Sequence, residues 1–372
     1  EILSKATDIP VVASEICVTL SMIKNLPNCK DVITEMLQYG STESQLFSRV
    51  LFESIKKIIE ETSDYNKISE MIPYLVDYAK LGMTEQGLQH NRSDILFMFS
   101  AICLKSDKFI SNYFSDIYPL LVQCYEQTQD IEALNCLTNI ATSMVSEFDQ
   151  FLPELMENIF QLFGDPYNNE NINCISDLLY NLNHYFTLTD YVHNFIEAIF
   201  GVLQEREKDL TVYSELLEVL SMFFSKYFEQ IEDAVVPIVR LVSNVVLILE
   251  DVKSFDYEKN RFISVVTNFI NVLLTQCDGQ ISVQWFELGF KILESAANSI
   301  DLEADEEESK YPIKVYAELI SILFNMNESD FCELVEQNQE ILSFIFKLNG
   351  YQDCHDNLPE PFRKMQDDDD DE

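Results

Sequence analysis

Apolar residues recur at spacings of three and four along most of the chain, which is the pattern of amphipathic helices. Segment 149–163 is a clear case, and the residues that share its apolar face are Leu152, Leu155, Met156, Ile159, Phe160 and Phe163. The preceding segment, 131–148, has the same spacing, and only two residues separate the two segments. A connection this short permits only an antiparallel helical hairpin.

The same pattern predicts a series of helix pairs from one end of the chain to the other. We place the pairs at 12–25/29–39, 43–62/65–82, 93–105/108–127, 131–147/150–163, 171–186/189–205, 210–226/229–249, 259–276/281–299 and 312–326/329–348. Ser and Asp residues at several of these starts are suitable helix N-caps.

The pairs are related by an internal repeat. Three first helices end in similar aromatic segments, MVSEF (144–148), LNHYF (182–186) and FSKYF (224–228). Proline recurs near the start of second helices, as in FLPEL (151–155) and VVPIV (235–239). Such a proline costs no hydrogen bond in the first turn, whereas one turn deeper it removes a donor and bends the helix. The positions leave both alternatives open.

A period near 40 residues, with two helices in each period, is typical of HEAT repeats. We therefore predict an all-α fold, a right-handed superhelical solenoid of about eight HEAT-like helical hairpins. The solenoid is expected to span residues 1–350, with an acidic loop at 301–310 between hairpins. Residues 351–372 are expected to form an acidic, flexible C-terminal tail. The chain begins in what reads as mid-domain sequence, so we expect it to be part of a longer protein.

Composition supports this fold and excludes several partners. With only 8 Gly and 10 Pro in 372 residues, the chain has too few turn-forming residues for a mostly β protein. The formal net charge of −40 repels phosphate backbones and anionic lipid, so we expect no nucleic-acid binding and no membrane insertion. The longest apolar run, 234–249, is too short to cross a bilayer. Nine dispersed cysteines indicate reduced thiols and a cytoplasmic or nuclear protein.

The sequence lacks the patterns that carry catalysis. Its four histidines are isolated, and it contains no glycine-rich phosphate loop or nucleophile motif. We therefore predict no enzyme activity, no catalytic residues, no metal site and no cofactor. An enzyme would require a carboxylate pair buried in a dry cleft, which periodicity alone does not reveal.

Three stretches of the sequence resemble the importin-β (karyopherin-β) family of nuclear transport receptors. They are SDKFISNYFSDIYPLLVQC (106–124), SMVSEFDQFLPELMENIFQLFGDP (143–166) and SKYFEQIEDAVVPIVRLV (225–242). Each has an aromatic residue at the end of the first helix, a polar spacer, then proline and an apolar second helix. The acidic loop and the strong negative charge are also similar to that family.

The resemblance implies a receptor that carries basic protein cargo through nuclear pores under control of the GTPase Ran. It implies that second helices face cargo and that grooves between first helices accept Phe-Gly repeats of nucleoporins. Members have about twenty repeats, so a chain with about eight would be part of one. We expect a monomer located in the cytoplasm, the nucleus and the nuclear pore. The cargo and the direction of transport, import or export, stay open.

Charge alone also predicts a basic partner, because an acidic surface attracts Lys- and Arg-rich segments over long range. Our candidate contacts are polar positions of two second helices and of the acidic loop: Glu154, Glu157, Asn158, Gln161, Asn194, Glu197, Asp305, Glu306, Glu307 and Glu308. Each of these residues is also compatible with an ordinary solvated helix face or loop. An alternative function is a HEAT-repeat scaffold subunit of a phosphatase, vesicle-coat or chromatin-regulating complex.

Overall fold

The computed structural model describes residues 10–23, 26, 28–39, 45–84, 91–105, 110–206, 208–247, 256–276, 283–300 and 313–363. Within these ranges the elements are helices joined by turns, and no strand occurs. The chain divides into two compact units, which are described separately. Unit 1 is Glu1–Gln161 with Asp177–Thr187, and unit 2 is Leu162–Ser176 with Leu188–Glu372.

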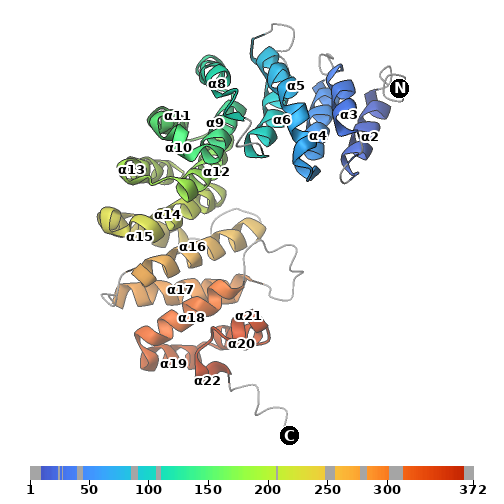
Figure 1. The fold of residues 1–372 in the computed structure, drawn as a ribbon. Helices are drawn as coiled ribbons and strands as arrows, with labels where there is room; N and C mark the ends of the chain where they lie inside the picture. The colour runs from blue at the N-terminus through green and yellow to red at the C-terminus, as the bar shows by residue number, and fades with distance from the viewer. Residues whose placement is uncertain are drawn as a thin grey trace. The chain divides into compact units, whose positions relative to one another are not determined.

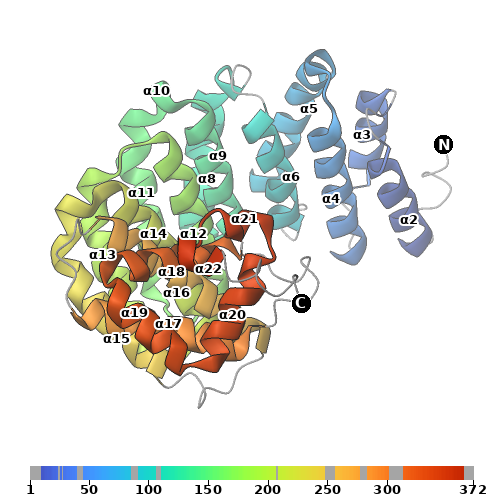
Figure 2. The same cartoon turned by 90° about the horizontal axis from the view of Figure 1, so that it is seen from below.

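Unit 1 consists of antiparallel helical hairpins packed side by side (Figures 1 and 2). The first helices of successive hairpins contact one another, as do the second helices α3, α5 and α8. The first helices are α2 (Pro10–Ser21), α4 (Gln45–Glu61), α6 (Arg92–Lys105) and α9 (Ile131–Ser143), the last followed by the single turn α10 (Val145–Phe148). The second helices are α3 (Cys29–Leu37), α5 (Tyr65–Thr84), α8 (Phe114–Thr128) and α11 (Leu152–Gln161), the last preceded by the 3₁₀ turn η2 (Asp149–Phe151).

Helix α12 (Asn169–Tyr185) contributes residues to both units. The other elements of unit 2 repeat the hairpin arrangement, with α14, α16 and α18 in contact in turn, and α13, α15, α17 and α20 likewise. These elements are η3 (Leu162–Gly164), α13 (Thr189–Glu205), α14 (Leu210–Ile231), η4 (Glu232–Ala234), α15 (Val235–Leu247), α16 (Asp256–Gln276), α17 (Val283–Ser299), α18 (Lys314–Met326), α19 (Glu328–Gln337), α20 (Gln339–Asn349), α21 (Gln352–His355) and α22 (Glu360–Arg363).

Polar contacts between neighbouring repeats have the predicted period. The Cys136 thiol lies 3.3 Å from the Leu96 carbonyl, 40 residues away. In unit 2, Asn271 donates to the Val315 carbonyl at 3.0 Å across 44 residues. These contacts join equivalent elements of successive hairpins, so the all-α repeat predicted from the sequence is confirmed.

Prolines occupy both of the positions that the sequence left open. Pro153 and Pro237 lie in the first turns of α11 and α15, where the missing N–H costs nothing. Pro73 and Pro119 lie deeper, inside α5 and α8, and both are exposed. A proline at these depths removes one bond of the helix ladder.

Three features differ from the sequence prediction. The expected single helix at 329–348 is two helices, because Asn338 is extended and its side chain accepts a hydrogen bond from the Ile341 N–H, which starts a new helix. Phe160, expected in the core, is 43% exposed. Residues 351–363, expected in a flexible tail, are instead packed on the repeats, because Leu358 and Phe362 are buried and Phe362 packs edge-on against Phe331. The final acidic run lies outside the described residues.

None of the described helices combines the length and apolar content that crossing a bilayer requires.

Candidate partner-binding surface

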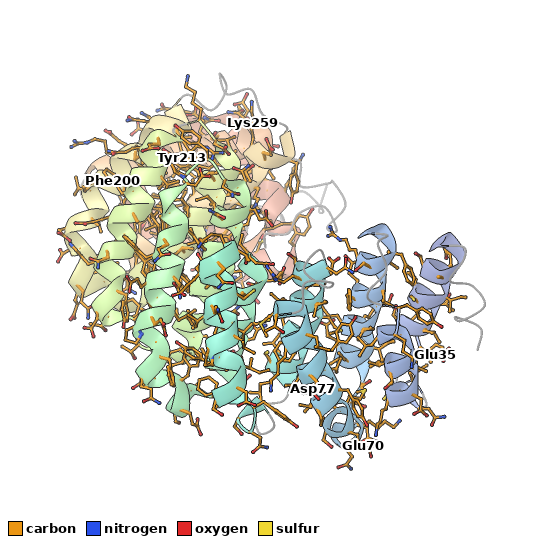
Figure 3. The ribbon with its side chains drawn as sticks, turned by 90° about the horizontal axis from the view of Figure 1, so that it is seen from above. Glu35, Glu70, Asp77, Phe200, Tyr213 and Lys259 are labelled. Atoms are coloured by element: carbon orange, nitrogen blue, oxygen red, sulfur yellow. The ribbon has the colours of Figure 1, made fainter. Side chains whose placement is uncertain are left out.

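Carboxylates are the main charged side chains on the exposed side of the second helices in unit 1. We call this surface, formed by the exposed side chains of α3, α5, α8 and α11, the second-helix face. Figure 3 labels two of its acidic residues, Glu70 and Asp77, together with the half-buried Glu35 of α3. Exposed apolar side chains lie among the acids on α5, where Tyr74 and Leu81 are 50% and 45% exposed.

Side-chain contacts connect each second helix of this face to the next. Lys30 on α3 lies 3.7 Å from a Glu70 carboxylate oxygen on α5. Lys80 on α5 donates to Asp116 on α8 at 3.0 Å. Lys30 and Lys80 are therefore already paired with acids of the same face.

The link between α8 and α11 is a phenol–carboxylate hydrogen bond in which Tyr118 donates to Glu154. The Tyr118 ring is held against Phe148 and Phe151, with centroid distances of 5.9 and 4.6 Å. The pKa of the Tyr118 hydroxyl is raised far above its usual value. Burial is the larger cause, and the hydrogen bond to Glu154 is the second. The phenol therefore stays protonated and remains a donor at any physiological pH.

Several carboxylates of the face lack a cationic partner. In the described part of the chain, Asp31, Asp77, Glu126 and Glu157 are exposed and lie within 4.0 Å of no basic group. Unpaired surface carboxylates create a negative potential that reaches about one Debye length, about 8 Å at physiological salt. The face can attract a cationic partner without first breaking its own ion pairs.

Of the residues predicted on α11, three are exposed and one is not. Glu154, Glu157 and Gln161 are exposed, as expected. Asn158 is 7% exposed, and its carbonyl accepts a 3.2 Å hydrogen bond from the Tyr125 hydroxyl of α8. The side of α11 that carries Asn158 is covered by the neighbouring repeat. The apolar pattern within one helix does not show such a contact between repeats. Asn158 is therefore removed from the predicted contact set.

The remaining predicted residues lie in unit 2 or outside the described residues. Asn194 and Glu197 are exposed on α13 in unit 2, and the Glu197 carboxylate lies 3.6 Å from His193 Nε2. Asp305, Glu306, Glu307 and Glu308 lie outside the described residues.

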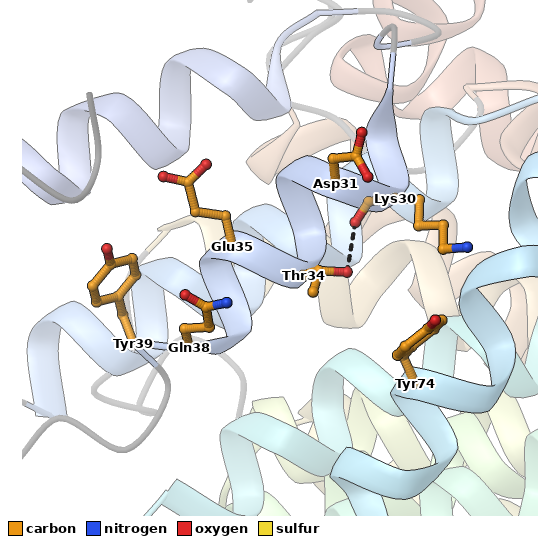
Figure 4. A pocket seen from close by; sticks show the side chains of 7 residues that line it. All are labelled: Lys30, Asp31, Thr34, Glu35, Gln38, Tyr39 and Tyr74. Carbon is orange, nitrogen blue, oxygen red and sulfur yellow. Dashed lines mark hydrogen bonds between the residues drawn. The ribbon is translucent and has the colours of Figure 1, made fainter. Parts of the chain in front are cut away.

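A cavity between α3 and α5 was missed by the sequence analysis. Its volume is about 500 Å³, and it is shown in Figure 4. The lining residues are Lys30, Asp31, Thr34, Glu35, Gln38, Tyr39 and Tyr74. The sequence signal was the spacing of Asp31, Glu35 and Gln38, at i, i+4 and i+7 of one helix, but nothing in it places Tyr74 opposite them.

Most of the described thiols are buried. They form no disulfide, and all of them except Cys332 are buried. Burial raises the pKa of the Cys17 thiol to about 11, and it also raises that of Cys136. Within the described ranges, no three His, Cys, Asp or Glu side chains are grouped as a metal site requires.

Together, the repeated hairpins and their period define the class of fold as a HEAT-repeat solenoid. No protein-family model and no curated protein sequence matches the chain. Solved structures do match it, and they include structures of importin β and of Kap95.

Three of these structures agree closely on the fold. The Kap95:Nup1 complex aligns with a TM-score of 0.73 at 12% identity, over 96% of this chain and 45% of that one. Importin β crystallised in a polyethylene glycol condition aligns at 0.71 and 11% identity, over 97% and 47%. A Kap95p structure that concerns the switch loops of RanGDP aligns at 0.66 and 13%, over 97% and 45%. The chain therefore has an importin-β-like HEAT-repeat fold, and it spans under half the length of these proteins.

Proposed function

We propose that the chain is part of a nuclear transport receptor and binds basic protein cargo on the second-helix face of unit 1. The observation that carries the proposal is the set of exposed carboxylates without cationic partners, on a face where Lys30 and Lys80 are already paired with acids. Basic segments would be drawn to this face by long-range attraction and held by carboxylate contacts. The exposed side chains of Tyr74 and Leu81 would add apolar contact area.

The fold supports two further partners. One similar structure is a complex of Kap95 with Nup1, and another concerns Kap95p with RanGDP. By this likeness we infer that Phe-Gly nucleoporins and Ran bind the whole protein, and that it moves between cytoplasm and nucleus through the pore.

The cargo proposal is tested by removing charge from the face without changing the backbone. One variant combines Asp31→Asn, Asp77→Asn, Glu126→Gln and Glu157→Gln. The matched control combines exposed acids elsewhere and changes the net charge equally: Asp233→Asn, Asp356→Asn, Glu229→Gln and Glu340→Gln. Binding of a labelled Lys/Arg-rich peptide to the full chain is measured by fluorescence anisotropy.

We expect the face variant to weaken binding on the order of tenfold at low salt, since exposed charge pairs contribute about 0.2–1 kcal/mol each. The control variant is expected to stay within about twofold of the unmodified chain. Equal losses in both variants would show that only the total charge matters, and would remove the face from the proposal.

A further inference from the structure

The cavity between α3 and α5 has the size and chemistry of a side-chain binding site. Its volume of about 500 Å³ falls within the usual range of roughly 300–1,000 Å³ for ligand sites. Its lining combines two tyrosines with carboxylates from α3, and Lys30 is the basic residue among them. This lining disfavours an anion and favours a cation with a flat, polarisable face.

A lysine side chain of the chain itself already contacts the aromatic ring of the cavity. The Lys30 ammonium lies 5.3 Å from the centre of the Tyr74 ring and 3.7 Å from a Glu70 oxygen. Tyr74 is nevertheless 50% exposed, and the Lys30 side chain is 38% exposed. Attraction to an aromatic face at an exposed site is worth only about 0.5–1 kcal/mol, so this internal contact is readily exchanged.

Helix α3 also carries, next to Lys30, a carboxylate of the lining that pairs with no cation in the described part of the chain. Asp31 lines the cavity from α3, is exposed, and has no basic group within 4.0 Å in the described part of the chain. Glu35 and Gln38 follow it at one-turn spacing along the same helix (Figure 4). The cavity thus presents a ring on α5 and acceptor oxygens on α3.

We propose that this cavity binds the guanidinium group of an arginine in a basic protein segment, and that Lys30 competes with it for Tyr74. The inference rests on the proposed binding of basic cargo and adds a residue-level preference to it. Arginine fits better than lysine because its planar group stacks on a ring while donating paired hydrogen bonds to a carboxylate. Lys30 acts as an internal cation that an incoming arginine displaces from the ring.

The test compares two peptides and three variants of the full chain. The peptides have equal length and charge, one with only arginine and the other with only lysine as its basic residue. Tyr74→Leu keeps apolar area but removes the ring, and Lys30→Met removes the competing charge. Lys80→Met is the matched control, because Lys80 also pairs with an acid across two second helices of this face but does not line the cavity.

The unmodified chain is expected to prefer the arginine peptide. Tyr74→Leu is expected to weaken arginine-peptide binding about three- to tenfold, with a smaller loss for the lysine peptide. Lys30→Met is expected to increase the arginine preference, whereas Lys80→Met strengthens binding of both peptides alike.

Two results overturn the inference, and they differ in what they leave standing. If both peptides bind, but Tyr74→Leu and Lys30→Met leave the ratio of their affinities unchanged, the cavity does not recognise arginine and the cargo proposal still stands. If neither peptide binds the full chain, the cargo proposal fails and the arginine site fails with it.

Discussion

Arg206 connects three segments of unit 2, so its removal is expected to loosen the junction between two repeats. Its guanidinium donates to the Pro166 carbonyl and to the Asn169 side chain, each at 2.8 Å. It also pairs with Asp209, whose carboxylate caps α14 by accepting from the Val212 N–H. The Arg206 side chain is only 12% exposed, so water replaces these contacts poorly.

The perturbation is Arg206→Met, which keeps most of the side-chain volume and removes every donor. A hydrogen bond that involves a charged group contributes about 1.5–3 kcal/mol, and Asn169 is exposed and regains water. We therefore expect a loss of about 3 kcal/mol, with about half of that for Arg206→Lys, which keeps the charge but not the forked geometry.

Hydrogen exchange measured by mass spectrometry is the assay, because repeat arrays open locally. A loss of about 3 kcal/mol corresponds to exchange faster on the order of a hundredfold at the starts of α12 and α14. Arg240→Met, which removes an exposed arginine from α15, is the control and is expected to leave exchange unchanged. Exchange in Arg206→Met within about twofold of the unmodified chain would refute the reasoning.

Three further predictions concern packing, pH and thiol chemistry. A Cβ added at Gly289 would lie 2.7 Å from a Leu323 methyl, so Gly289→Ala is expected to lower the thermal midpoint measured by calorimetry. Gly201→Ala is the matched control, because a Cβ there meets no atom within 4 Å. It is expected to raise the thermal midpoint, since it stabilises the helix by about 1 kcal/mol. Burial raises the pKa of the Asp94 carboxyl above 3.8, so its ionised form destabilises the fold at neutral pH. Asp94→Asn is therefore expected to raise the thermal midpoint at pH 7. A gain of the same size below about pH 3.8, where Asp94 itself is protonated, would contradict this. Cys332 is partly exposed, so iodoacetamide is expected to label it before the buried thiols of the described residues. Its labelling is expected to be slower than that of free cysteine, because burial and the nearby glutamates raise its pKa. Peptide mapping measures the order of labelling.

The helices and their period could be predicted because each depends on residues close together in sequence. The hairpin of α9 and α11 follows from apolar spacing and a short connection, and both are local features. The break at Asn338 could not be predicted in the same way. An Asn side chain caps a helix or tolerates the interior of one, and the neighbouring packing decides between these outcomes.

The site was less predictable because it depends on contacts between repeats. Asn158 is polar and follows the exposed Glu157 directly in sequence, yet the preceding repeat covers it through Tyr125 of α8. The cavity likewise joins Asp31 on one helix to Tyr74 on another, 43 positions later in the chain. The apolar period within one helix identifies its solvent-exposed side. It does not identify which exposed residues of neighbouring helices face each other.

Capture from cell extract, followed by elution with Ran, tests whether this chain is part of a transport receptor. The immobilised full chain is washed with RanGDP, then RanGTP, then high salt, and each eluate is identified by mass spectrometry. We predict that basic proteins elute with RanGTP but not with RanGDP, and that Phe-Gly nucleoporins are among the bound proteins. A stoichiometric complex with phosphatase, vesicle-coat or chromatin subunits that ignores both forms of Ran would contradict it and identify a scaffold instead.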